Sequence, residues 1–347
     1  MVWCCSTAPS PLGKTNPHNG DRMSAFDELL SYVVDRGVGA SDAINPFWQH
    51  ELRRLKALLE ANKSPSMDEV VRALGYYDFR LEPGQKNRET STWAEVMSAL
   101  KTGGENTRQS EHAGSISCLS RHKHLDRYID LLDQFGLVSN MPLARHYWYS
   151  FKLIEQMKRK NIEPPAVFLE VGAGGGQFAM MMCHYQAVGH YVIADLPEML
   201  LNSMRTLSAR FPHAHLHFGE VPEFSSGELN FWFLDTSDIQ KVPDKSVDVM
   251  VNFNSLMEMD EGIRNFYIEQ LYRSGRSGSI FYNVNRRQRT MTRQDGEEYD
   301  NHPLFYPYRS TDTVIEWEPD QIQQDNRSRQ FQSPHGSFCI SRMAIIE

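Results

Sequence analysis

Apolar residues recur at helical spacing through the first half of the chain. Leu52, Leu55, Leu58 and Leu59 fall on one face of a helix that Asn45-Pro46 is expected to open. The same spacing, with Ser24 as a cap and Ser66 with Glu69 as a capping box, predicts helices over 24–34, 70–74, 93–101, 125–137 and 145–160. Residues 76–89 and 102–110 lack this pattern, which predicts a loop and an exposed linker.

From residue 167 the pattern changes to short apolar runs separated by helical segments. These runs predict strands over 167–171, 190–195, 213–218, 231–235, 247–252 and 278–285. Such alternation favours an α/β fold, a Rossmann-like doubly wound and mostly parallel sheet, here preceded by an N-terminal helical domain. We therefore predict a disordered lead over 1–22, a helical module over 23–124 and a ligand-binding domain over 125–347.

The composition is that of an ordinary globular protein. The 347 residues are 40% hydrophobic and 23% charged, with a formal net charge of −8. This acidity argues against nucleic acid or an anionic membrane as the main partner, because phosphate binding needs clustered Lys and Arg. No membrane-spanning run, secretory signal or Cys-x-x-Cys spacing is evident in the sequence, so we expect a reducing, cytoplasmic setting.

A glycine-rich turn after the first predicted strand offers the clearest chemistry. Glu170 is a carboxylate at the end of a buried run, which is costly unless a charged or hydrogen-bonding group meets it. Gly172, Gly174 and their neighbours then leave main chain without Cβ atoms, where a cofactor could lie. Asp195 ends the second strand, where a carboxylate can hold ribose hydroxyls. A dinucleotide or S-adenosylmethionine suits such a turn, but Gln177 stands where the dinucleotide fingerprint has its third glycine.

Three histidines alternate at the start of another predicted strand. His213, His215 and His217 would share one face, and three imidazoles could hold a metal ion. Ligands of parallel sheets gather at the carboxyl ends of strands, however, so a solvated strand face is favoured and no metal is expected.

The run Glu-x-Gly-x-Gly-x-Gly at 170–176 resembles motif I of class I S-adenosylmethionine-dependent methyltransferases. The resemblance narrows to the sugar O-methyltransferase family and covers about 126 to the C-terminus. The segments that carry it are His146-Tyr-Trp-Tyr149, Glu170-x-Gly-x-Gly, Asp195-Leu-Pro-Glu198, the strand with Asp248, Asn254 to Met259, and Phe281-Tyr-x-x-Asn285. It implies that 125–347 is a methyltransferase domain that binds S-adenosyl-L-methionine as cofactor.

The resemblance also assigns cofactor contacts. Glu170 would lie near the amino end of the methionine part, while Gly172, Gly174, Asp195, Leu196 and Asn254 would surround the cofactor. Asp235 and Thr236 would contact the adenine, a role for which Gly219-Glu220 competes.

Methyl transfer to a hydroxyl requires in-line placement and removal of a proton by a general base. Glu258 is the first candidate because it follows a strand at the ligand edge, although it could instead cap or pair on its helix. His302, in an aromatic and proline-rich loop, is second, and His146 is third. A structural role is the alternative for both.

Polar residues near the last predicted strand are candidates for binding the acceptor. Tyr282, Asn283 and Asn285 could hydrogen-bond it. Four arginines follow that could bind an acidic or nucleotide-linked sugar or could simply be solvated, namely Arg286, Arg287, Arg289 and Arg293.

The resemblance thus implies an O-methyltransferase acting on a hydroxyl of a sugar or sugar-containing small molecule, in a chain that could form a homodimer. The first alternative is O- or N-methylation of another secondary metabolite. A second is a non-catalytic scaffold whose helical module binds a protein, and a third is a nicotinamide oxidoreductase.

Overall fold

The structure is a computed structural model, and it describes eleven segments of the chain: 24–39, 52–62, 65–74, 83–102, 107–162, 166–185, 188–225, 227–287, 289–292, 298–324 and 339–347. The predicted lead over 1–22, the helix start at Asn45-Pro46 and the side chains of Arg289 and Arg293 lie outside the described residues.

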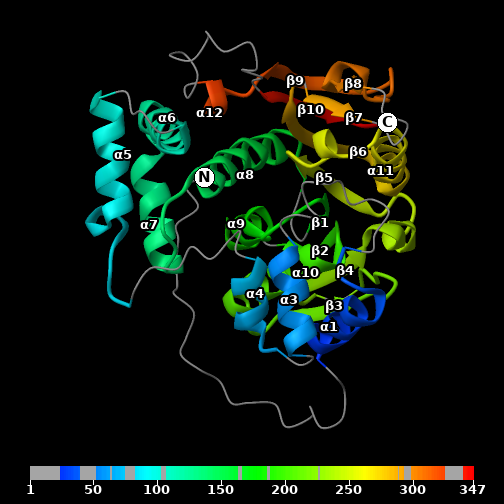
Figure 1. Cartoon of the computed structure of the whole chain (residues 1–347). Coiled ribbons are helices and arrows are strands. Elements are labelled where there is room, and N and C mark those ends of the chain that lie inside the picture. The colour runs from blue at the N-terminus through cyan, green and yellow to red at the C-terminus, as the bar shows by residue number, and fades with distance from the viewer. Residues whose placement is uncertain are drawn as a thin grey trace.

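An eight-stranded, mostly parallel sheet forms the centre of the molecule (Figure 1). Its strands are β1 (Ala166–Val171), β2 (Val188–Asp195), β3 (His215–Phe218), β4 (Asn230–Asp235), β5 (Val247–Phe253), β6 (Gly275–Arg286), β9 (Thr313–Pro319) and β10 (Cys339–Ile345). Their order is β3-β4-β2-β1-β5-β6-β10-β9, with β10 antiparallel to both neighbours. A separate hairpin pairs β7 (Arg289–Thr292) with β8 (Glu298–Asn301). The predicted Rossmann-like, doubly wound and mostly parallel sheet is confirmed.

The strand order reverses at β1. From β1 the chain moves outward through β2 to β3 at the edge and comes back to β4, which lies between them. It then crosses to β5 and β6 on the other side of β1. Such a switch point leaves a crevice outside the carboxyl ends of the two central strands, where ligands of doubly wound sheets bind. The turn at 172–176 follows β1 directly and therefore lies at this crevice.

Helices cover both faces of the sheet (Figure 1). One face packs its large side chains, such as Phe168, Tyr191 and Phe231, with α8 (Met141–Arg159), α9 (Gln177–Tyr185) and α10 (Pro197–Arg210). The other face packs Leu169, Val171 and their neighbours against α11 (Glu261–Ser274). Because both faces are buried, β1, β2, β4 and β5 are apolar along nearly their whole length.

The helices before the sheet lie in two places. α1 (Ala25–Arg36) and α4 (Met67–Leu74) pack against α10, with α3 (Arg53–Ala61) beside α4. α5 (Ser91–Thr102), α6 (Thr107–Arg121) and α7 (Leu125–Phe135) gather near α8 and α12 (Gln321–Gln324), as Figure 1 shows. Asn87, in the short helix η1 (Asn87–Glu89), hydrogen-bonds Asp133 and Leu137. The domain division at residue 124 therefore stays a prediction, with contacts crossing it.

Most predicted helices are present, with shifted ends. Ser24 caps α1 through a hydrogen bond from Asp27 N, and Ser66 and Glu69 form the predicted capping box. The linker predicted over 102–110 is wrong in part, because α6 already begins at Thr107. The helix predicted from residue 145 begins earlier, at Met141, because the Asn140 side chain accepts a hydrogen bond from Leu143 N.

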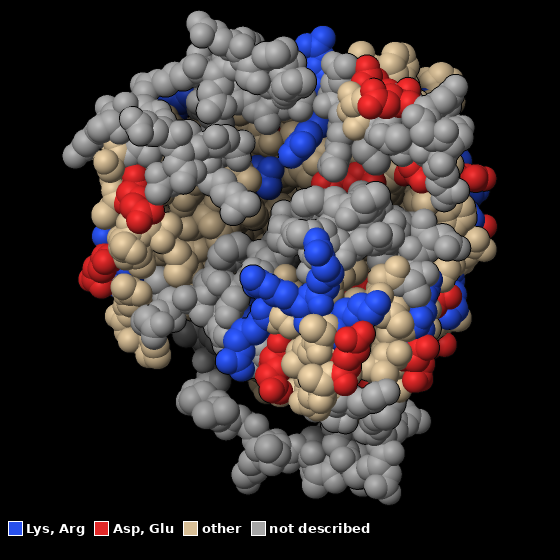
Figure 2. All heavy atoms as spheres, in the orientation of Figure 1, with Lys and Arg blue, Asp and Glu red and all other residues tan. Residues whose placement is uncertain are grey.

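No described helix is long and apolar enough to span a lipid bilayer. On the face shown in Figure 2, described Lys and Arg side chains gather across the lower middle, with Asp and Glu side chains below them and towards the rim.

Candidate functional site

Three glycines of the turn after β1 have backbone angles that other residues rarely adopt. The φ values are 73° at Gly172, 57° at Gly174 and 70° at Gly176. A Cβ on Gly172 would overlap the Ser255 side chain, and one on Gly176 would lie 3.1 Å from Ser203 Cβ. Packing by the protein's own residues thus adds to the preference for glycine at Gly172 and Gly176, whereas at Gly174 the backbone angle alone favours it.

Asp195 is joined directly to this turn. Its Oδ2 accepts a hydrogen bond of 2.8 Å from Gly174 N, and its Oδ1 accepts one of 2.8 Å from Leu196 N. Burial raises the pKa of Asp195 to about 6, although the two amide hydrogen bonds act in the opposite direction. Each carboxylate oxygen keeps acceptor capacity for a further donor. Leu196, also buried, caps the start of α10.

Glu170 is the second-to-last residue of β1, just before the turn, and is 2% exposed. Its Oε2 accepts a hydrogen bond of 2.8 Å from the Tyr191 hydroxyl on β2. Burial raises the pKa of Glu170 to about 8, helped by the charge of Asp195 and opposed by the Tyr191 hydrogen bond. Glu170 is therefore mostly protonated at neutral pH, and Tyr191 is a partner that sequence reasoning missed.

Glu258 is brought towards the same carboxylates. It ends the short helix η3 (Leu256–Glu258) after β5, it is half-buried, and its charge contributes to the raised pKa of Asp195. The first-ranked base candidate thus lies at the same end of the sheet as Asp195. Its backbone N–H donates to Ser255 O at 2.9 Å.

Asp235 and Thr236 follow β4, at the same edge as Asp195. Thr236 Oγ1 donates to Asp235 Oδ1 at 2.8 Å, while Asp235 Oδ2 accepts from Tyr32 and Arg36 of α1. The competing Gly219-Glu220 follows β3, where Gly219 O accepts from Lys241 Nζ and Glu220 contacts His217. Both pairs lie at the carboxyl edge, and only Asp235 is bound by the N-terminal helix.

The beginning of α8 lies at this edge on the other side of β1. His146 contacts Phe178, just after the glycine turn, and Phe253 at the end of β5, with ring centroids 6.3 and 6.1 Å apart. Burial lowers the pKa of His146 to about 3, and Nδ1 has no hydrogen-bond partner in the structure. His146 is therefore neutral at physiological pH.

A buried polar network next to His146 was not foreseen. The Tyr149 hydroxyl donates to Asp320 Oδ2 at 2.6 Å and accepts from Gln323 Nε2 at 3.0 Å. Cys339 Sγ lies 3.1 Å from Gln323 Oε1 and 3.4 Å from Oδ1 of Asn254, which has φ of 61°. Asn254, a predicted cofactor contact, thus bonds towards β10. The sequence alone does not reveal that the backbone of Asn254 has a positive φ.

His302 lies elsewhere. Its Nδ1 accepts a hydrogen bond of 3.0 Å from Leu304 N and so caps the short helix η4 (Pro303–Phe305). Burial lowers the pKa of His302, as does nearby Arg287. No contact in the described part of the chain joins it to the glycine turn.

The alternating histidines have ordinary partners. His215 pairs with Glu228, and His217 stacks on Trp232 with centroids 3.9 Å apart while it hydrogen-bonds Asn230. Across the described ranges, no group of three or more His, Cys, Asp or Glu could hold a metal ion.

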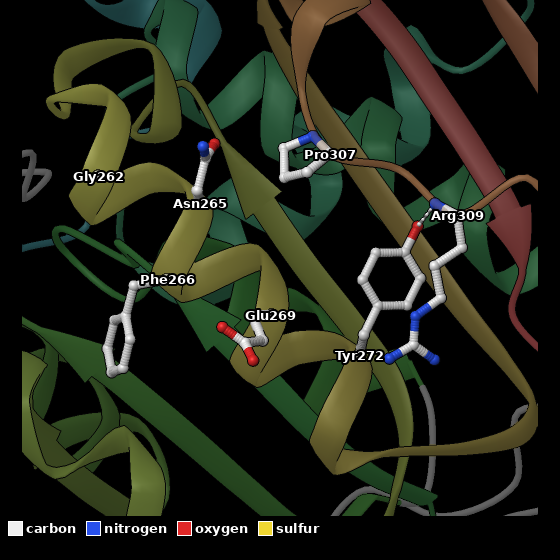
Figure 3. A pocket seen from close by; sticks show the side chains of 7 residues that line it. All are labelled: Gly262, Asn265, Phe266, Glu269, Tyr272, Pro307 and Arg309. Atoms are coloured by element: carbon white, nitrogen blue, oxygen red, sulfur yellow. Dashed lines mark hydrogen bonds between the residues drawn. The ribbon is translucent and has the colours of Figure 1, made fainter.

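A surface groove of about 470 Å³ lies between α11 and residues 307–309 (Figure 3). The lining side chains come from both segments, and Arg309 N donates to the Tyr272 hydroxyl at 3.1 Å. None of its lining residues is a predicted site residue, so the candidate site remains the carboxyl edge of β1, β2, β4 and β5.

No protein-family model matches this sequence, and no curated protein matches it. Solved structures of similar fold exist. They include the [4+2]-cyclase SpnF, with 15% identity, 56% of this chain and 80% of that chain covered, and a TM-score of 0.39. A SAM-dependent methyltransferase from Aquifex aeolicus has 15% identity, 56% and 88% coverage and a TM-score of 0.34.

A further similar structure is the 1,6-didemethyltoxoflavin-N1-methyltransferase of Burkholderia thailandensis, determined with bound 1,6-didemethyltoxoflavin and S-adenosylhomocysteine. It shares 13% identity over 55% of this chain and 75% of that chain, with a TM-score of 0.36. These similarities concern the fold alone, so a function can be inferred only from the residues described above.

Proposed function

We propose that this chain is an S-adenosylmethionine-dependent methyltransferase. The observation that carries the proposal is the hydrogen bond from Gly174 N to Asp195 Oδ2, which joins the glycine turn to a ribose-type carboxylate at the topological switch point. The acceptor capacity left on Asp195 suits the two hydroxyls of a ribose.

Glu170 supports the sulfonium cofactor over a dinucleotide. A buried carboxyl whose pKa is about 8 becomes ionised when a cation approaches it, and the methionine part of the cofactor carries an ammonium group. Gln177 also argues against a dinucleotide, since a side chain occupies the position where that fingerprint needs glycine.

The bound cofactor would supply an activated methyl group, so the chain has two tasks, to orient the acceptor and to remove its proton. Glu258 is the proposed base, because it is half-buried, follows β5 and lies near enough to Asp195 to influence its charge. His146 is the second candidate, as a neutral imidazole with an unpartnered buried Nδ1 between the turn and β5. His302 ranks below both because its Nδ1 is engaged as a cap.

We propose a hydroxylated small molecule as the acceptor, with a sugar as the first class to test. The support is the family resemblance from Asp126 onward together with the polar side chains at the carboxyl end of β5 and at the amino end of the antiparallel β10. Another metabolite methylated at O or N is the alternative, and product analysis separates the two.

The test is incubation of the full chain with S-adenosylmethionine and a panel of neutral and acidic sugars, with product identification by mass spectrometry. We expect a methylated sugar, and we expect Glu258→Gln to slow turnover by about 10²- to 10⁴-fold, the usual contribution of a general base. Glu269→Gln, on the exposed side of α11, is the matched control. Unchanged turnover in Glu258→Gln would remove Glu258, and cofactor binding without any product would favour a scaffold.

A further inference from the structure

The N-terminal helix α1 reaches the carboxyl edge of the sheet through two polar side chains. The Tyr32 hydroxyl donates to Asp235 Oδ2 at 2.6 Å, and Arg36 forms an ion pair with the same oxygen and donates to the Tyr32 hydroxyl at 2.8 Å. The Asp235 side chain is 1% exposed and the Arg36 side chain is 29% exposed, so the carboxylate of this pair is shielded from water while the guanidinium is partly in contact with solvent.

A third contact lies just beyond the helix. Gly39 N donates to Glu198 Oε1 at 2.7 Å, and Glu198 stands in the first turn of α10, three residues after Asp195. The end of α1 and its following turn therefore lie across the ends of both β2 and β4. These are the strand ends at which a nucleoside binds in a doubly wound sheet.

The adjacent side of α1 is held by apolar packing. Phe26, Leu29, Leu30 and Val33 are buried and fall on one stripe of the helix. The Tyr32 ring also packs edge-on against Phe218 of β3, with centroids 5.5 Å apart. Tyr32 and Arg36 are four residues apart, so one helix face presents both to Asp235.

The hydrogen bonds on Asp235 leave little capacity for a ligand. Oδ2 accepts from Tyr32 and Arg36, and Oδ1 accepts from Thr236 Oγ1. A carboxylate oxygen accepts about two hydrogen bonds, so one position on Oδ1 remains. The contacts from α1 fix the direction in which this remaining acceptor position of Asp235 points.

We propose that α1 forms one wall of the cofactor site, and that Tyr32 and Arg36 are positioning residues that orient Asp235 toward the adenine. This inference rests on the proposed function. Residues of the N-terminal module would then take part in cofactor binding. The sequence motifs for that binding, in contrast, all lie after residue 165.

The first test measures S-adenosylhomocysteine affinity by calorimetry for the full chain and its variants. We expect Arg36→Gln and Tyr32→Phe each to weaken binding by about tenfold, the effect of losing one hydrogen bond to a charged group. Arg36→Lys should retain most of the affinity, because a single nitrogen of Arg36 makes both contacts and an ammonium can replace it. Arg88→Gln, which removes the exposed pair Arg88–Asp126 elsewhere in the module, is the matched control and should bind normally.

The second test needs no variant. Amide hydrogen exchange of the wild-type chain should slow in α1 when S-adenosylhomocysteine binds, and it should slow more in α1 than in α5. Wild-type affinity in Arg36→Gln and Tyr32→Phe, or equal exchange in α1 with and without bound ligand, would overturn the proposal. No binding to the wild-type chain would instead overturn the proposed function.

Discussion

Glu170 is the residue whose chemistry depends most on its surroundings. It stands near the end of a strand that is buried on both faces, and the carboxylate of Asp195 lies close enough to raise its pKa further. Burial raises its pKa to about 8 from an ordinary value of 4.5. In the folded chain the proton is therefore held over a range in which the unfolded chain has lost it.

This difference predicts how stability changes with pH. The contribution of Glu170 is greatest below pH 4.5 and is lost as the pH rises to about 8, because only the unfolded state ionises in that range. Glu170→Gln cannot ionise, so it should be more stable than the wild type by about 1–4 kcal/mol at pH 9, with a smaller difference at pH 5. Urea unfolding at both pH values measures this, and an equal difference at both would contradict a raised pKa.

Asp195 gives a prediction about binding. Asp195→Ala removes the acceptor of the Gly174 amide together with the proposed acceptor of the ribose hydroxyls. We expect S-adenosylhomocysteine affinity to fall by about 1–3 kcal/mol, as for lost hydrogen bonds to a charged group. Calorimetry checks this against Asp244→Ala, an exposed carboxylate that pairs with Arg273 far along the chain. Equal affinity of wild type and Asp195→Ala would exclude the residue from the site.

At the scale of the elements, the turn between β1 and α9 is where sequence and structure agree best. The spacing of its glycines was sufficient to predict a strand, a turn and a helix, because positive φ values select glycine locally. The packing contacts that require glycine at each position were less predictable. Gly172 and Gly176 are required by Ser255 and Ser203, which are distant in sequence.

This packing predicts unequal costs of alanine at two glycines with similar φ. Gly136, with φ of 64° at the end of α7, has nothing within 4 Å of an added Cβ, whereas Gly172, with φ of 73°, meets Ser255. Gly136→Ala should cost about 1–2 kcal/mol of stability from the backbone alone. Gly172→Ala should cost about 1–3 kcal/mol more, from overlap of side chains. Thermal unfolding of both variants measures the difference, and equal losses would contradict the packing.

The contacts that sequence reasoning missed share one physical property. Tyr32 and Arg36 reach Asp235 from about two hundred residues away in sequence, and Tyr149 reaches Asp320 across a similar separation. Periodicity reports which face of an element is buried, not which distant polar group meets it. The strands, the glycine turn and Asp195 were predictable because their signals are local. The partners of Asp235, Glu170 and Asn254 were not.

At the scale of the whole molecule, helices from both ends of the N-terminal region frame the sheet's carboxyl edge. α1 meets the ends of β2 and β4, and α8 meets the end of β5 near Phe253. The buried side chains of α1, α8, α9 and the sheet belong to one continuous core. Ligand binding at this edge should therefore raise the free energy of unfolding of the whole molecule.

That coupling predicts selective stabilisation by ligand. At a concentration about 100 times Kd, S-adenosylhomocysteine should stabilise the folded chain by about 2.7 kcal/mol and raise Tm by about 2–6 °C. NADH at the same concentration should leave Tm unchanged. Differential scanning calorimetry measures both shifts, and a shift with NADH alone would restore the oxidoreductase alternative.

The most direct test of the account is a crystal structure of the full chain with S-adenosylhomocysteine. We predict that the ribose hydroxyls lie within hydrogen-bond distance of Asp195, the ammonium near Glu170 and the adenine between Asp235 and α1. A nucleoside bound elsewhere, or a turn at 172–176 closed by Ser255 and its neighbours with no ligand in the crevice, would contradict it.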